Sequence, residues 1–352
     1  MNSSEHDVSS ILKSVRTSQP IQDYSQKYLT AIELQPETCS SRGMVVDIKS
    51  NSPSQTVMAF IFAPNGHPVS NSLALQSTTF LASSKILQSL RDELPLNFRF
   101  ILQTDSSPDF AKSVIQQGGL NHVSTLFGLT EHTAVADDQI GVQAGPLIPS
   151  KSSFTLRIFQ NNGKSSDLAR TQNILVAAQT VISLRQALNR RIDPLIPSVI
   201  SFSSVNMLNS GSDGIELTGS FQNLEDSDSQ HIFDVIENTV HGVSAAQGSQ
   251  FQIKLKNDVS AIIPEQNTTE TLLLVSKEIF NAENVMSFDY PVNRLGGLTE
   301  FLKQVPAAIL YHGDVSRLIN DSEQGKSSGL ANLCSRIVKT LVKCALSVCL
   351  AA

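Results

Sequence analysis

The sequence of 352 residues contains no tryptophan, four cysteines and no long uninterrupted hydrophobic run. The cysteines, at positions 39, 334, 344 and 349, show no CxxC spacing, and three of them fall within the last twenty residues. This pattern argues against a disulfide framework and against a zinc finger, and it favours a reducing compartment. The start of the chain also lacks a basic stretch that leads into an apolar one, so we expect no secretory signal and a cytoplasmic location.

Charge is also scarce. Charged residues make up 16% of the chain, against about a quarter in typical globular domains, and the net charge is −6. An acidic balance without basic clusters gives no electrostatic footprint for nucleic acid, so we expect no nucleic-acid partner. What the chain does have is length and a hydrophobic fraction of 40%, which suffice for two domains with separate cores.

The first part of the chain alternates strand and helix patterns. We expect a disordered tail over residues 1–10 and, further on, a helix between residues 71 and 94 where apolar residues recur at near-helical spacing. Short apolar segments predict strands at residues 43–50, 56–64, 98–103 and 123–129. Such alternation is typical of a three-layer α/β/α domain with a largely parallel sheet.

The middle of the chain follows a different order, with two strands in succession. Patterns in residues 150–260 predict β-α-β-β-α-β, the ferredoxin-like α+β arrangement. Its first helix, residues 168–191, has an apolar stripe made of Ile174, Ala178, Val181, Leu184 and Leu188. We therefore predict a discontinuous α/β domain, residues 11–149 plus 261–352, interrupted by an α+β lid or dimerisation domain over residues 150–260.

Several strings resemble those of the zinc metallopeptidase family that contains aminoacylases, hippurate hydrolases and auxin-conjugate amidohydrolases, peptidase family M20. "AGPLIPSKSSFTLRIF" resembles the passage into the lid of that family, and "RRIDPLIPSVISFSSV" and "NSGSDGIELTGSF" resemble segments inside the lid. "LTEFLKQVP" resembles the approach to a late strand. The resemblance covers about residues 40–315 and implies a two-domain hydrolase fold whose lid commonly pairs two subunits.

The resemblance also implies two metal ions held by histidines and carboxylates, with a glutamate as general base. Placed position by position, the residues of this chain differ from that set. The family's metal ligands, base and lid histidine correspond to Leu73, Ala74, Ser106, Ser107, Thr130 and Asp167, and its late Ser-Glu-Asp-Phe segment corresponds to Gly296 and Gly297. The lid arginine that holds a substrate carboxylate corresponds to Gln222, whereas Asn209 is retained as a candidate ligand contact. Leucine, alanine and glycine side chains cannot ligate zinc, and serine is no general base near neutral pH.

The string "TDSSPDF", residues 104–110, has a second interpretation that needs no catalysis. Ser107 is a good N-cap, Pro108 a good first helical residue, and Asp109 suits the positive end of a helix dipole. The segment where the family has its catalytic glutamates is thus predicted to begin a helix.

Polar residues at other predicted strand ends leave room for a relocated metal site. His67, Asp105, Glu131 and His132 would converge if the carboxyl ends of the strands share one edge, and zinc or manganese would be the cofactor. Asp137, Asp138 and His312 also lie near strand ends. The competing interpretation, which we favour, is that these are solvated loop residues with no cofactor.

The last segment, residues 331–352, is amphipathic and too interrupted by basic residues to span a bilayer. A helix packed on the sheet is the favoured interpretation, and membrane association through lipidated Cys344 or Cys349 is the alternative.

Two hypotheses for function follow. The first, which we favour, is a catalytically inactive homologue that acts as a binding, regulatory or scaffold protein. It would be a homodimer, or a heterodimer with a related active enzyme through the lid, with a peptide or acyl-amino-acid as possible ligand. The second is a metal-dependent amidohydrolase or peptidase that cleaves N-acyl amino acids or small peptides with the relocated site.

Overall fold

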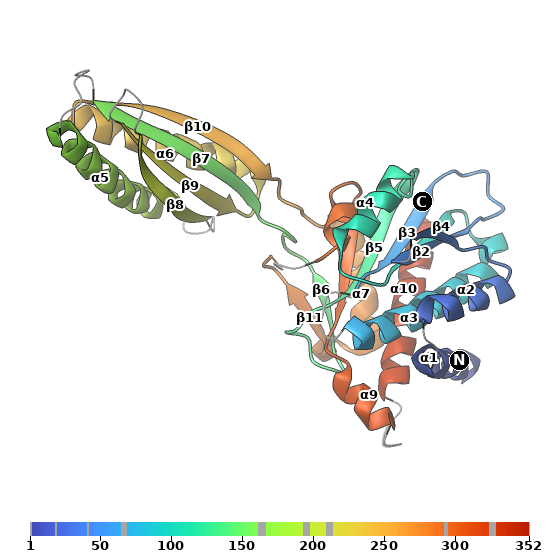
Figure 1. Ribbon diagram of the computed structural model, residues 1–352. Helices are drawn as coiled ribbons and strands as arrows, with labels where there is room; N and C mark the ends of the chain where they lie inside the picture. Colours follow the sequence, from blue (N-terminus) through green and yellow to red (C-terminus); the bar gives the residue numbers. More distant parts are fainter. Residues whose placement is uncertain are drawn as a thin grey trace. The chain divides into compact units, whose positions relative to one another are not determined.

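The chain divides into two units, shown in the computed structural model of Figure 1. The structure describes residues 2–17, 20–40, 42–64, 69–160, 167–192, 198–208, 214–291, 295–323 and 329–351. Unit 1 contains residues 1–145 and 264–352, and unit 2 contains residues 146–263. The predicted lid boundaries, residues 150 and 260, fall a few residues inside unit 2.

Unit 1 is built on a mixed sheet with the strand order β1-β2-β4-β3-β5-β12-β6-β11. The strands are β1 (Glu37–Ser40), β2 (Gly43–Ile48), β3 (Val57–Phe62), β4 (Asn97–Gln103), β5 (Val123–Glu131), β6 (Ile140–Gln143), β11 (Val285–Phe288) and β12 (Ala307–His312). The central strands β4, β3, β5 and β12 run parallel, while β2 and β6 are antiparallel to their neighbours in this group. Strand β3 is buried along its whole length, as expected for a parallel strand covered on both faces.

Helices cover both faces of this sheet and so form the predicted three layers. One face packs on α1 (Asn2–Thr17), α2 (Ile21–Ala31), α3 (Val69–Ser89), α7 (Gln266–Phe280) and α10 (Gly329–Ala351), which share one apolar core with the strands. The other face packs on α4 (Pro108–Gln116) and α8 (Leu298–Leu302): the α4 ring of Phe110 lies against Gly43, and Leu298 lies against Gly128. The short α9 (Ser316–Glu323) and the 3-10 turns η1 (Arg91–Glu93) and η2 (Ala282–Asn284) complete the described elements of unit 1.

One expectation about the chain ends needs revision, and the packing of the last helix is confirmed. The predicted disordered tail is wrong for residues 2–10, because they belong to α1, where Val8 is buried in the core. The carboxyl-terminal helix α10 does pack on the protein, but deeply: Cys334 and Cys344 are fully buried and Cys349 nearly so. These thiols therefore do not present the exposed groups that lipidation would need. None of the described helices is long and apolar enough to cross a membrane.

Unit 2 has the predicted ferredoxin-like order. It contains β7 (Ser150–Gln160), α5 (Asp167–Arg191), β8 (Ser198–Leu208), β9 (Gly214–Asn223), α6 (Asp226–Ala246) and β10 (Ser249–Val259). The strands form an antiparallel sheet in the order β10-β7-β9-β8, and the two helices pack with it around a separate apolar core. The fold class predicted from the sequence, an α/β domain interrupted by an α+β domain, is confirmed.

The buried stripe of α5 differs from the predicted one. Leu184 and Leu188 are buried as expected, but Ile174 is about half exposed at 51%. Val176, Ala177 and Thr180 take the buried positions instead. The helix has apolar residues on two sides, and the periodicity alone could not tell which side faces the sheet.

Candidate functional site

The polar residues singled out in unit 1 lie where β4, β5 and β12 end, close to the first turns of α3 and α4. In a parallel sheet these carboxyl ends meet at one edge, which is where α/β proteins place their ligands. The geometry at this edge therefore decides whether the predicted residues form one site.

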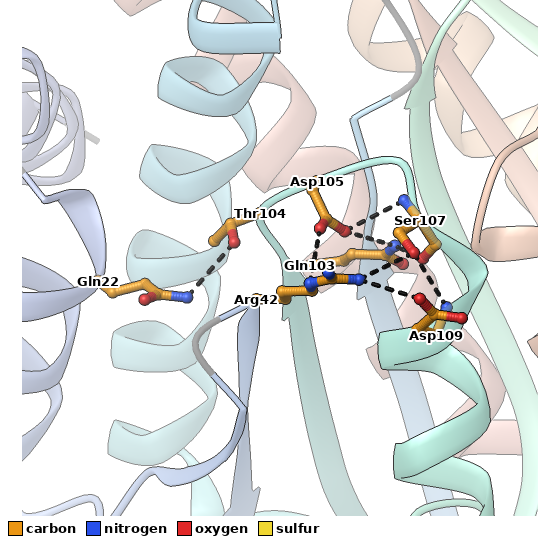
Figure 2. A network of polar contacts seen from close by, with 7 residues as sticks. All are labelled: Gln22, Arg42, Gln103, Thr104, Asp105, Ser107 and Asp109. Atoms are coloured by element: carbon orange, nitrogen blue, oxygen red, sulfur yellow. Dashed lines mark hydrogen bonds and ion pairs between the residues drawn. The ribbon is translucent and has the colours of Figure 1, made fainter.

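The loop that follows β4 is organised around Arg42 (Figure 2). The Arg42 guanidinium donates through Nη1 to the Ser107 hydroxyl and to Asp109 Oδ2, both at 3.1 Å, and its Nε lies 3.4 Å from Asp105 Oδ2. Asp105 Oδ1 also accepts from the backbone N–H of Ser107 at 3.1 Å. Both carboxylates of this loop thus lie beside an arginine that compensates their charge.

The N-cap predicted for this loop is confirmed. The Ser107 hydroxyl accepts from the backbone N–H of Asp109 at 3.2 Å, and Pro108 is the first residue of α4. Ser107, which the resemblance assigns to the place of a family carboxylate, therefore has the local role of beginning a helix.

Gln103, the last residue of β4, packs directly against Gly297, which lies at the start of α8. The Gln103 side chain is fully buried, and its Nε2 donates to the Ser107 carbonyl at 2.6 Å. A Cβ added at Gly297 would lie 2.3 Å from Gln103 Nε2 and 2.7 Å from the Ser107 carbonyl oxygen. The two stretches that the resemblance assigns to the family's glutamate pair and to its late Ser-Glu-Asp-Phe segment are therefore in mutual contact.

The other family positions in unit 1 belong to the apolar interior. Ala74 is buried in the main core and Leu73 packs against it, both on α3. Thr130, in β5, is fully buried, and its hydroxyl oxygen has no hydrogen-bond partner in the described structure. Burial of these side chains among apolar neighbours suits packing rather than metal ligation.

A second polar group lies between α3 and the end of β12, centred on His312, which is fully buried. Its Nδ1 donates to the Gly313 carbonyl at 2.7 Å, so the neutral ring presents Nε2 as an acceptor. Nε2 lies 3.2 Å from Gln76 Nε2 and 3.3 Å from the Ser72 hydroxyl. Burial lowers the pKa of His312 to about 4, while the bond to Gly313 and the charge of Asp314 act in the opposite direction. This histidine is therefore neutral near pH 7.

Glu131, at the end of β5, adjoins the same group. Burial raises the pKa of its carboxyl, a hydrogen bond with the Ser72 side chain lowers it, and the nearby charge of Asp314 raises it further. The net change is upward, so Glu131 is a better proton acceptor than an exposed glutamate.

His132 points into aromatic surroundings rather than toward Glu131's polar partners. Its ring centroid lies 4.6 Å from that of Phe288 and 5.2 Å from that of Tyr311. Its Nδ1 accepts from the backbone N–H of Ala134 at 3.1 Å, and burial lowers its pKa. The neutral ring therefore carries its proton on Nε2, and its lone pair on Nδ1 is already engaged by the backbone.

The structure does not assemble the relocated metal site from the residues it describes. Asp105 is held in the Arg42 network, whereas Glu131 and His132 face the groups described above. Across the described ranges, no three histidine, cysteine, aspartate or glutamate side chains lie close enough to hold a metal ion. His67 lies outside the described residues. The side chains that the resemblance assigns to the family positions, as far as the structure describes them, therefore do not fit a two-metal centre.

The candidate residues of unit 2 are only partly described. Gln222 is exposed on β9, paired across the strands with Val199 of β8 and Lys151 of β7. Asp167 is the first residue of α5, although its side chain is not described, and Asn209 lies outside the described residues. The ligand roles of Gln222 and Asn209 remain predictions.

The sequence interpretation missed Arg42, Ser72, Gln76 and Gln103. Ser72 and Gln76 sit four residues apart on a predicted helix, a spacing that places both on one face and could have indicated a paired polar function. Arg42 and Gln103 carry no local signal, because their partners are distant in sequence.

Known proteins similar to this chain are hydrolases. The chain is 25% identical over 223 residues to an N-acyl-L-amino acid amidohydrolase of Geobacillus stearothermophilus, an alignment that covers 60% of each chain. It spans about 60% of the length of the curated relatives it matches. No protein-family model matches the chain.

Two solved structures share the fold. A protein described as an aminohydrolase, from methicillin resistant Staphylococcus aureus, superimposes with a TM-score of 0.66 at 16% identity, covering 96% of this chain and 99% of that one. A dinuclear metal binding peptidase from the M20 family, of Bacillus subtilis, superimposes with a TM-score of 0.63 at 14% identity, covering 97% and 99%. The similar curated proteins are thus named as amidohydrolases and deacetylases, one of the two solved structures is described as a peptidase of the M20 family, and this chain shares the fold of both structures.

Proposed function

We propose that this protein is a member of the M20 family that has kept the scaffold but not the two-metal hydrolysis, and that acts as a binding, regulatory or scaffold protein. The observation that supports the proposal is the contact between Gln103, Ser107 and Gly297, because the resemblance assigns Ser107 and Gly297 to segments where the family has carboxylates. A peptide or acyl-amino-acid is the proposed ligand, by analogy with the substrate class named for the amidohydrolase relative.

Metal content and hydrolysis measured together test this proposal. Purified protein is expected to contain no stoichiometric zinc, manganese or cobalt, and to release no amino acid from N-acyl amino acids when these metals are added. The Geobacillus amidohydrolase, assayed in parallel, provides the positive control. Metal-dependent turnover that co-purifies with the monodisperse protein would contradict the proposal.

A metal-dependent amidohydrolase or peptidase is the second candidate, because the relatives found by sequence are named hydrolases. The specific residue that favours it is Glu131, a strand-end carboxyl whose raised pKa suits a general base. If turnover is found, Glu131→Gln and His132→Ala should abolish it, while the exposed Glu93→Gln in η1 should leave it unchanged. Retention of turnover in both site variants would remove these two residues from the mechanism.

We also propose that unit 2 pairs with a second copy of the chain or with a related active enzyme. Strand β8 is an edge of its sheet and exposes Val199, Val205 and Met207. Helix α5 exposes Ile174, Leu175 and Ile182. An unpaired edge beside apolar side chains is a surface that proteins commonly cover by association. A mass of two chains by light scattering would support the homodimer, and a monomeric mass at micromolar concentration would leave only the heterodimer.

A further inference from the structure

We infer that the place of the family's metal centre has become a closed structural joint, in which Gln103 and Gly297 fill the space and Arg42 supplies the positive charge. The inference deepens the proposed function, on which it rests for the correspondence of positions.

The packing between β4 and the start of α8 leaves no room for even one methyl group. At residue 297 an added Cβ would lie 2.3 Å and 2.5 Å from the two amide atoms of Gln103. It would also lie 2.7 Å from the Ser107 carbonyl oxygen, a backbone atom that cannot rotate away. Real Cβ contacts are not this short, so no side chain with ligating atoms fits at residue 297 without displacement of a loop.

The neighbouring Gly296 lies against Ser106, in the same loop after β4. Its φ is +52°, in the left-handed region that favours glycine, and an added Cβ would lie 3.1 Å from the Ser106 carbonyl oxygen. Both residues of the loop before α8 therefore lie against both serines of the loop after β4. A side chain at either residue would therefore press on the loop after β4, most severely at Gly297.

Charge compensation in the joint comes from protein rather than from an ion. Arg42 lies within 3.1–3.4 Å of Asp105, Ser107 and Asp109, so a guanidinium already occupies the hydrogen-bonding positions around the loop. The backbone of the same turn contributes as well, since the Thr104 N–H donates to the Arg42 carbonyl at 2.9 Å. The β1–β2 turn, the β4–α4 loop and the start of α8 are thus tied together.

Thermal unfolding of Gly297→Ala, Gln103→Ala and the double variant tests the joint. Gly297→Ala is expected to lower the Tm by roughly 3–10 °C, as overpacking does in a unit of this size. Because part of the clash is with the Gln103 amide, the Tm of the double variant should fall by measurably less than the sum of the two single-variant decreases. Gly242→Ala in α6, where an added Cβ would meet nothing within 4 Å, is the matched control and should not lower the Tm.

Titration with zinc, manganese and cobalt completes the test on the wild-type chain. No saturable heat and no rise in Tm are expected, since a ligand that bound the native state would raise it. Strictly additive losses in the double variant, or a saturable metal at this joint, would overturn the inference. If the double variant loses less Tm than the sum of the single losses but the protein hydrolyses substrate, only the proposed function is overturned, because the metal would then lie elsewhere. If the losses of Tm are additive and the protein is free of metal and inactive, only the inference of a closed joint is overturned.

Discussion

His312 illustrates how burial can remove a histidine from acid–base chemistry. It lies at the end of β12, the place where an α/β enzyme commonly keeps a catalytic residue, yet it is fully buried among Ser72, Gln76 and Gly313. With Nδ1 donating to a carbonyl and Nε2 accepting, the neutral ring is satisfied and a second proton would have to displace a donor. Its role at neutral pH is therefore structural.

This arrangement predicts acid sensitivity. The pKa of His312 is about 4 in the folded chain against 6.5 as its ordinary value, so the unfolded state binds the proton first as the pH falls. The resulting stability is complete above pH 6.5 and is lost between pH 6.5 and pH 4, by about 3 kcal/mol at most. Glu131, whose pKa is raised, works in the opposite direction, because its contribution is lost as the pH rises.

Urea unfolding at pH values from 4 to 7 measures this loss. The difference between wild type and His312→Gln should shrink or reverse as the pH falls through this window, while the exposed His231→Gln follows the wild type. A difference that is independent of pH would show that His312 does not titrate as its burial requires.

At the scale of elements, α5 and β8 show where periodicity succeeds and where it stops. The spacing of apolar residues placed the helix over nearly its true length, but it assigned Ile174 to the core. The sheet selects which stripe it covers, and the remaining apolar side chains are left facing outward. Helix α5 packs against α6 and the sheet of unit 2, and the apolar side chains that these neighbours do not cover face outward.

A charge on the uncovered stripe should therefore affect association and not folding. Ile182→Asp, at a side chain that is 58% exposed, is expected to convert a dimer to a monomer with little change in Tm. Gln252→Asp, on the opposite edge strand β10, is the matched control and should keep the wild-type mass. Sedimentation velocity distinguishes the outcomes, and an unchanged dimer in Ile182→Asp would remove α5 from the interface.

At the scale of the whole molecule, each unit has its own apolar core. The two connections that lead into unit 2 run side by side, because the Leu147 N–H donates to the Ile262 carbonyl at 2.7 Å. An inserted unit whose ends are adjacent can be removed without stretching the chain around it.

Replacement of residues 146–263 by a short glycine–serine linker should leave unit 1 folded. The shortened chain is expected to keep a cooperative thermal transition and native-like near-ultraviolet circular dichroism, because its core and its sheet are intact. The isolated segment 146–263 should also show a cooperative thermal transition. A molten or aggregated unit 1 would show that its core depends on unit 2.

The sequence by itself determined the local patterns and their order. Hydrophobic periodicity predicted many of the strands and helices and the interrupted α/β arrangement, and the cap at Ser107 could be read from three adjacent residues, but α1, β1 and β6 were missed. The assignment of side chains to the family's metal positions also came from the sequence, and it stays a prediction. Each of these depends on neighbours within a few residues along the chain.

Only the tertiary structure decided what those positions do. Arg42 meets Asp105, and Gln103 meets Gly297, across separations of 63 and 194 residues that no local pattern encodes. The burial of His312 and the dispersal of Asp105, Glu131 and His132 were settled by packing around the strand ends. A site is made of contacts between distant segments, and their distances are set by the folded core rather than by spacing in the sequence.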